Sequence, residues 1–352
     1  MRGQTRREFL CRTIPAAVAT GTALTFGPFR NALAAQLPPA TDRRGYTAGK
    51  YALEIDGQFA GWVESVAGGR AMSDVVAGNN LVGDNIQRKH LAGIKYEDIT
   101  VNCGTGMSKN FYDWIKASFD KQYLRKSGAV ISIDYNDKEH SRLNWTSALL
   151  SEVAFPALDA ASKDAAKMTV KFSPEITQTI VPHGGTGAAY TAVGYKSGQA
   201  VQKKWLPSNF RLQIAGMEAA CTRVNRIEGI TLRIPSAEKQ PLGASRAIVG
   251  VPPRFQAPNL VVTLPEQDAM PFYNWYRDVV AKGNNGTNER EGLLAYLTPD
   301  LRESIFVLGL HGLSLFKWTP EKVAPGGETI RRVQVEFSCK DITFLPAAAA
   351  WA

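Results

Sequence analysis

The histidines are the first residues to consider for chemistry, because a metal site needs ligands at a short, regular spacing. The sequence holds four of them, His90, His140, His183 and His311. They are scattered, and no His-x-x-x-His spacing occurs. We therefore predict no metal site and no metal or organic cofactor.

A nucleophile and a carboxylate site are the other catalytic options. No Gly-x-Ser-x-Gly elbow and no P-loop occur, although 182–187 looks a little like the Gly-rich oxyanion loop of esterases. Without the elbow, a linker is the better interpretation of that segment. Asp134, Asp137 and Glu139, with Asp113, could form a carboxylate site, but charges at a strand end and its turn are usually just solvated. We predict no catalytic residues.

Two tryptophans, Trp114 and Trp275, could stack on sugars or bases. Each comes three residues after a phenylalanine, Phe111 or Phe272, at helical spacing. An aromatic pair on the apolar side of a helix favours packing in a core. We therefore predict that these four side chains form the buried face of two core helices.

The cysteines are few and lack CxxC spacing. Cys11 falls in the N-terminal segment, which leaves Cys103, Cys221 and Cys339. At most one intramolecular disulfide could form among these three. We expect none, and interpret all three as small buried hydrophobic residues within strands.

The elements that carry the tryptophans occur twice. Residues 97–114 and 258–275 are both 18 residues long, and the offset between them is constant at 161 (258 − 97 and 275 − 114). Each copy is an apolar β-branched run, a turn and the start of a helix. This repetition without a length change predicts two copies of one domain.

The same order of further segments surrounds each copy. A hairpin precedes it (51–57 and 62–69, echoed by 210–216 and 224–229), followed by a loop of about 25 residues (70–96, echoed by 233–256) that we interpret as a contact arm. We expect glycine to end the helices near Ser127-Gly128 and Lys282-Gly283. The strands expected after the helix are 129–135, 142–150, 153–158 and 166–173, echoed by 293–297, 304–310, 313–318 and 331–338.

One helix cannot cover both faces of so many strands. We therefore predict a mainly β (α+β) fold with two tandem β-barrel or sandwich domains, each with one flanking helix. The predicted divisions are a signal peptide at 1–35, a linker at 36–48, domains at 49–180 and 208–346, a linker at 181–207 that could hold a short hairpin through 189–193, and a tail at 347–352.

The N-terminus carries a specific local pattern. Arg6, Arg7, Phe9 and Leu10 fit the twin-arginine export pattern, although Cys11 stands where a lysine is common, and a weakly apolar run follows. Ala32 and Ala34 then form a small-x-small cleavage site. The alternative is an ordinary basic amphipathic N-terminus.

This pattern predicts export of the folded protein through the twin-arginine (Tat) translocase to the periplasm or the medium, with no membrane association after cleavage. The formal net charge is +9, and +5 without the first 34 residues (9 − 5 + 1). That charge is too small and too dispersed to predict specific nucleic-acid binding.

The order of motifs in 51–114 carries a family resemblance. A strand ending in Asp-Gly, a Val-x-x-Val-x-Gly strand, a long Gly-rich loop, Lys-Tyr-x-x-Ile-Thr-Val and a Tyr-x-Trp helix follow one another. This order resembles phage tail tube proteins of the contractile-tail class and the tube proteins of bacterial contractile injection systems. The resemblance continues to about residue 180, through the Trp145 strand, and is weaker in 210–345.

The resemblance implies a structural, non-enzymatic protein that self-associates through sheet edges into a six-domain ring and stacks through the long loop. Three two-domain chains would then form one pseudo-six-fold ring, or a tube of such rings, with other injection components as partners. One alternative is a hub or adaptor of the injection apparatus, in which rings do not stack. Another is an exported enzyme or a ligand- or carbohydrate-binding protein that uses the 70–96 loop.

Overall fold

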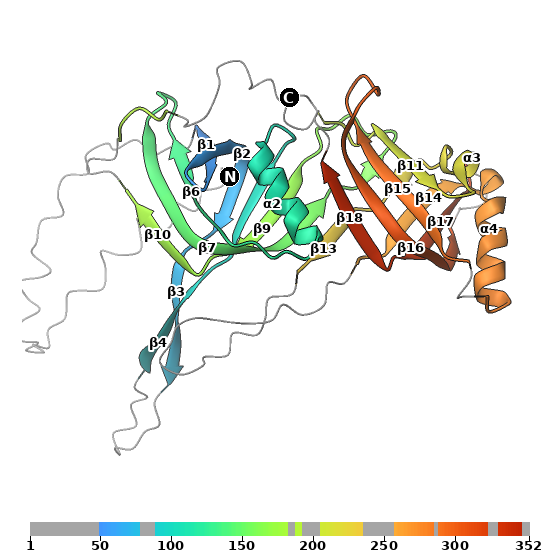
Figure 1. Cartoon of the computed structure of the whole chain (residues 1–352), viewed down its shortest axis with the longest axis horizontal. Helices are drawn as coiled ribbons and strands as arrows, with labels where there is room; N and C mark the ends of the chain where they lie inside the picture. Colours follow the sequence, from blue (N-terminus) through green and yellow to red (C-terminus); the bar gives the residue numbers. More distant parts are fainter. Residues whose placement is uncertain are drawn as a thin grey trace, which may run out of the picture. The chain divides into compact units, whose positions relative to one another are not determined.

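The computed structural model describes residues 49–77, 89–181, 187–191, 205–234, 257–284, 288–322 and 330–346. There the chain is mostly β-strand, in two barrel-like sheets and a two-stranded ribbon (Figure 1). The predicted mainly β class with two barrel-like sheets is confirmed. Arg6, Arg7, Phe9, Leu10, Ala32 and Ala34 of the predicted signal lie outside the described residues.

The first sheet closes on itself. Its strands from the first half of the chain are β1 (Lys50–Ile55), β2 (Gln58–Gly68), β5 (Ile99–Cys103), β6 (Lys126–Ile133), β7 (Glu139–Phe155), β9 (Met168–Ser173) and β10 (Ile176–Ile180). The order is β10-β7-β6-β1-β2-β5-β9, and β9 pairs again with β7. Because β7 pairs with β6 along its first part and with β9 along its second, the sheet forms a barrel.

The second sheet has a related order but stays open. Its strands from the second half of the chain are β11 (Phe210–Ile214), β12 (Arg226–Ile227), β14 (Leu260–Pro265), β15 (Arg290–Leu297), β16 (Ser304–Pro320), β17 (Arg332–Ser338) and β18 (Asp341–Pro346). The order is β11-β15-β16-β17-β14-β12, with β18 beside β16. A short helix, α3 (Glu218–Cys221), follows β11 where β2 follows β1 in the first sheet. The predicted second strand of this hairpin, 224–229, is therefore wrong except at β12.

The two longest strands, β7 and β16, each replace two shorter strands of the prediction. Each runs unbroken for 17 residues. Ser147 in β7 and Gly312 in β16 have positive φ values of 53° and 61°. The predicted break in β16 falls at Gly312, and the predicted break in β7 falls at 151–152, where the pairing with β9 shifts register. Each strand continues there and pairs with a different neighbour along its second part.

The predicted helices are present. They are α2 (Lys109–Phe119) in the first half, and α4 (Met270–Tyr276) in the second, which follows η2 (Glu266–Asp268) and continues as a π-helical turn, η3 (Arg277–Ala281). The predicted stop at Gly283 agrees with its φ of 75° just after η3. The predicted stop at Gly128 is wrong: α2 ends at Phe119, and Gly128 lies inside β6, where it faces the Glu54 carbonyl and the Trp145 ring.

The predicted 70–96 loop is a β-ribbon. Its strands are β3 (Ala71–Ala77) and β4 (Lys89–Tyr96), which pair only with each other among the described strands and extend beyond the first sheet (Figure 1). Met72, Val75, Leu91 and Ile94 are exposed on the ribbon. In the echo segment, 233–256, only the end of β13 (Ile230–Arg233) and Ile234 are described.

Candidate functional site

The four candidate carboxylates do not converge on one site. The Asp134 carboxylate accepts hydrogen bonds from the backbone N–H groups of Asn136 (2.8 Å) and Lys138 (2.9 Å). The Lys138 N–H contributes most to lowering the pKa of Asp134. Asp137 pairs with Lys50 at 2.5 Å, Asp113 with Lys109 at 2.7 Å, and Glu139 with Arg142 at 3.0 Å. Each carboxylate is thus engaged separately, as in an ordinary protein surface.

One histidine lies in a triad-like arrangement that the sequence did not indicate. His311 Nδ1 lies 2.6 Å from Glu291 Oε2, and its Nε2 lies 3.0 Å from Thr343 Oγ1. These side chains come from β16, β15 and β18, and a side chain at Gly309 would fill the space of the Thr343 hydroxyl. The Glu291 and His311 side chains are 66% and 44% exposed, so water competes for these hydrogen bonds. The arrangement joins three strands, and none of the three residues lines the hollow described below.

The other histidines are not gathered around it. His90 lies on β4 and His140 on β7, while His183 and most of the 182–187 segment lie outside the described residues. Within the described part of the chain, no group of three or more His, Cys, Asp or Glu residues is placed to hold a metal ion. In the same part, no helix is long and apolar enough to cross a membrane.

The three described cysteines are free thiols. Burial raises the pKa of Cys103 to about 12, and the pKa values of Cys221 and Cys339 to about 11. All three thiols are therefore protonated at neutral pH. Because the thiolate is the nucleophile, none of them is poised for nucleophilic chemistry.

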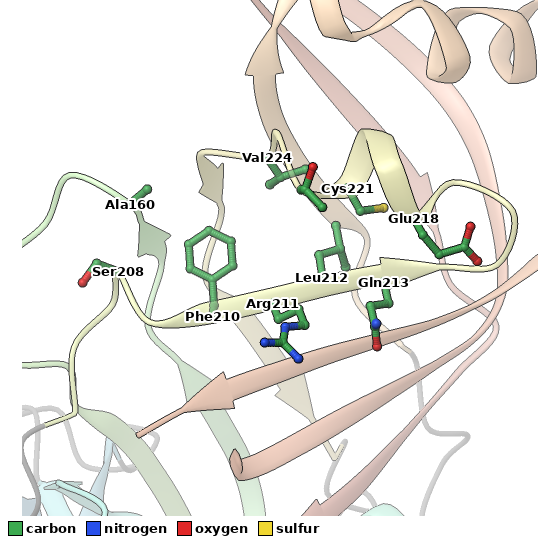
Figure 2. Close-up of a pocket in the computed structure, with 10 residues that line it drawn as sticks. Ala160, Ser208, Phe210, Arg211, Leu212, Gln213, Glu218, Cys221 and Val224 are labelled. Atoms are coloured by element: carbon green, nitrogen blue, oxygen red, sulfur yellow. The ribbon is translucent and has the colours of Figure 1, made fainter. Parts of the chain in front are cut away.

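A hollow of about 450 Å³ lies where the second sheet is open (Figure 2). Phe210 and Leu212 of β11 point toward Cys221 and Val224, whereas Arg211 and Gln213 point to the other side of the strand. In the first sheet, the corresponding space is closed by pairing of β1 with β2. Its lining also includes the polar residues Ser208, Glu218 and Thr222, so the hollow is not purely apolar.

A polar cluster lies on one face of the first barrel. The Glu54 carboxylate, 7% exposed, accepts hydrogen bonds from Arg142 Nη1 at 2.8 Å and from the Tyr190 hydroxyl at 2.9 Å. Burial and then the Glu54 carboxylate raise the pKa of Tyr190, so its proton stays on the hydroxyl. Of the predicted 189–193 hairpin, only 189–191 are described; there Ala189 forms a bridge with Lys138, and Tyr190 contacts Glu54 of β1. The cluster therefore joins the described residues 187–191 to the first barrel.

The two sheets meet at a junction that is built from strand pairing. β13, from the second half, pairs antiparallel with the second part of β7, so that Ile230 lies opposite Phe155 and Arg233 opposite Glu152. In return, β8 (Leu158–Asp159), from the first half, pairs with β12. Each sheet therefore takes one strand from the other half, and strand addition at a sheet edge is the interaction that the chain uses to join them.

Aromatic side chains fill the same junction. Helix α2 packs against β18, and Phe344 lies 6.4 Å from Tyr112 and 5.4 Å from Phe119, measured between ring centroids. Phe155, at the end of β7, contacts Phe306 at 5.4 Å. These rings belong to one hydrophobic core that spans both halves. Aromatic pairs of this kind are worth about 0.5–1.5 kcal/mol beyond the burial of their area.

The four residues predicted to face the core lie on the helices expected. Phe111 and Phe272 are fully buried, and Trp114 and Trp275 are 1% and 4% exposed. The indole N–H groups donate to backbone carbonyls, Trp114 to Leu124 at 2.8 Å and Trp275 to Asn288 at 3.1 Å. Both rings are therefore enclosed and offer no platform for a sugar or a base.

Comparison with known proteins finds a family model that matches part of the chain. Residues 47–176 match the model of the T4-like virus tail tube protein gp19 family. The predicted resemblance to tail tube proteins is therefore confirmed for this part of the chain. No curated protein matches the sequence.

Solved structures of injection-system proteins are similar to part of the chain. The sheath/tube terminator of the PVC extracellular contractile injection system is 17% identical, with a TM-score of 0.35, over 40% of this chain and 99% of that one. The tube-terminating cap of the anti-feeding prophage is 16% identical, with a TM-score of 0.37, over 42% and 99%. Hcp1 from Flavobacterium johnsoniae is 16% identical, with a TM-score of 0.26, over 39% and 95%.

The sequence did not indicate the junction itself. Strands β10 and β18 were missed, and with them the contact of Phe344 with α2. A signal was present in the alternation of Ile342, Thr343 and Phe344, which is typical of a strand with one buried face.

Proposed function

We propose that this protein is a structural, non-enzymatic, tail-tube-like protein whose chains assemble through sheet edges into rings of three. The observation that carries this proposal is the match of 47–176 to a tail tube family, in a chain that holds two barrel-like sheets of related strand order. If each sheet occupies one position, three chains supply six positions around the axis.

Edge strands that lack a partner support assembly. β10 ends the first sheet, and β11 ends the second, among the strands that the structure describes. The exposed edge of a sheet is a template for pairing with another chain, and ring closure removes it. The same kind of pairing already joins the two halves within one chain.

Export is the second part of the proposal. The pattern Arg6, Arg7, Phe9 and Leu10, followed by Ala32 and Ala34, supports transport of the folded chain by the Tat translocase. The rings then assemble in the periplasm or the medium, together with other components of an injection apparatus.

Light scattering of the purified protein tests the assembly. The purified protein should give a species with three times the mass of its single chain, 38.3 kDa when the N-terminal segment is retained, or a multiple of it, at micromolar concentration. A monomer at every concentration up to the solubility limit would contradict the ring.

A further inference from the structure

The helices of the two halves present the same buried residues to their own sheets. Phe272 and Trp275 of α4 stand 161 residues after Phe111 and Trp114 of α2 (272 − 111 and 275 − 114), and all four are buried. Each tryptophan contacts a phenylalanine of the strand behind it, Trp114 with Phe172 and Trp275 with Phe337. The two helices can therefore be compared position by position.

Two positions differ sharply in exposure between the helices. Tyr112 and Phe119 of α2 are 0% and 4% exposed, whereas their counterparts Tyr273 and Val280, at the same offset of 161, are 38% and 45% exposed. The side chain that contacts both Tyr112 and Phe119 is Phe344 of β18, from the other half of the chain. The second helix thus exposes the apolar positions that β18 covers on the first.

The strand that would cover them also has a counterpart. β18 pairs with β16, where Phe344 lies opposite Leu308, and β10 pairs with β7, where Thr179 lies opposite Leu143. Thr179 precedes Phe344 by 165 residues, and Leu143 precedes Leu308 by the same number (344 − 179 and 308 − 143). β18 packs against helix α2, while Thr179 on β10 is exposed. The first half therefore exposes the strand whose equivalent covers a helix in the junction.

The long strands show the same difference. The second part of β7 has β9 on one side and β13 on the other. The corresponding part of β16, Lys317 to Pro320, pairs only with β17 among the described strands. In each of the three comparisons, α2 with α4, β18 with β10 and β7 with β16, the first element makes a contact at the junction. The second element of each comparison lacks that contact among the described residues.

We propose that the α4–η3 face bearing Tyr273 and Val280 binds β10 of a second copy of this chain, as α2 binds β18 within the chain. The interface is heterologous: the second half of one chain contacts the first half of the next. The inference rests on the proposed function, because it requires that copies of the chain associate. It deepens that function by naming the two surfaces that meet.

The chemistry of these surfaces makes the contact between chains weaker than the junction within one. Thr179 stands where Phe344 fills the junction, so less apolar area is buried and the aromatic contacts are absent. Pro320 has no N–H to donate, which shortens any strand pairing at the free edge of β16. Association between chains is therefore expected to depend on concentration, while the junction stays closed.

Disulfide trapping tests the pair of surfaces. Thr179→Cys and Val280→Cys are introduced together into the full chain in a Cys11→Ser, Cys339→Ser background, and the protein is oxidised at the concentration where light scattering detects the oligomer. The corresponding junction pair, Phe119 and Phe344, has ring centroids 5.4 Å apart, so the new cysteines are expected to face each other across the proposed contact. Non-reducing electrophoresis should show disulfide-linked dimers and trimers. In the trimers, all three interfaces should be linked, which closes the ring.

Two controls fix the geometry. Mixing the Thr179→Cys protein with the Val280→Cys protein should give linked pairs only, and neither should link alone, because the interface is heterologous. The matched pair Thr179→Cys with Leu293→Cys should stay unlinked, since Leu293 is equally exposed, at 45%, but lies on β15.

The outcomes separate the two proposals. Linking of the Thr179/Val280 pair above the Thr179/Leu293 control supports the docking surface. An oligomer by light scattering in which the two pairs link equally, or only the control pair links, overturns the docking surface and leaves assembly intact. A protein that stays monomeric and links neither pair overturns both.

Discussion

At the scale of single residues, Gly128 has a structural role that differs from the predicted one. The glycine after the helix was interpreted as its stop, but α2 ends at Phe119 and Gly128 lies in β6. A side chain there would overlap the Glu54 carbonyl oxygen and lie 2.5 Å from Trp145 Cζ2. The position requires glycine because a neighbouring strand and an indole ring approach it closely.

Gly128→Ala is therefore expected to lower the free energy of unfolding by about 1–3 kcal/mol, the usual cost of overpacking. Denaturant titration measures the change. Gly93→Ala on β4, where no atom lies within 4 Å of the added methyl group, is the matched control and should change stability by less than about 0.5 kcal/mol. Equal losses for the two variants would contradict the packing that we describe around Gly128.

Residue patterns predicted which face of a helix is buried, but they did not predict contacts with residues far away in the sequence. The three-residue spacing of Phe111 and Trp114 was enough to predict a helix with one apolar face, because helical periodicity is local. Nothing near Tyr112 in the sequence indicates that Phe344 covers it. That contact depends on how the two halves pack, which periodicity does not encode.

At the scale of elements, the alternation of apolar residues predicted most strands, but their ends and bends were missed. Alternation in β9 and β17 was clear because each has one buried and one partly exposed face. Each long strand was predicted as two, although β7 continues through a register shift at 151–152 and β16 continues through the positive φ of Gly312. The β3–β4 ribbon was predicted as a loop because its exposed residues alternate little in polarity.

The ribbon carries the next prediction. Replacing 72–95 with a short glycine turn should leave both sheets folded, because the ribbon pairs with neither of them among the described strands. The midpoint of thermal unfolding should change by no more than a few degrees, while self-association measured by light scattering should weaken, since Val75, Leu91 and Ile94 are exposed apolar residues.

A second variant keeps the full length of 72–95 but changes Val75, Leu91 and Ile94 to serine. It separates loss of the exposed apolar side chains from loss of the whole ribbon. Both variants should assemble poorly under this account. Unchanged assembly in both would show that the ribbon is not a contact arm. It would also reopen the alternative in which the ribbon binds a ligand.

At the scale of the whole molecule, the junction between the two halves of one chain shows the kind of contact that we propose between chains. At the junction, α2 packs against β18, β8 pairs with β12, and the second part of β7 pairs with β13. The equivalent elements, β10 in the first half and the α4–η3 face in the second, are exposed. Under the proposed contact, copies would add head to tail until the ends meet, and three copies would close a six-position ring.

The most direct test of this account is negative-stain electron microscopy of the purified oligomer, with class averages of end-on views. Rings with six similar densities around a central axis, at a mass of three chains, are the result expected; stacked rings would indicate a tube and single rings a hub. Open filaments, rings with another number of densities, or isolated monomers at the concentration of the light-scattering oligomer would contradict it.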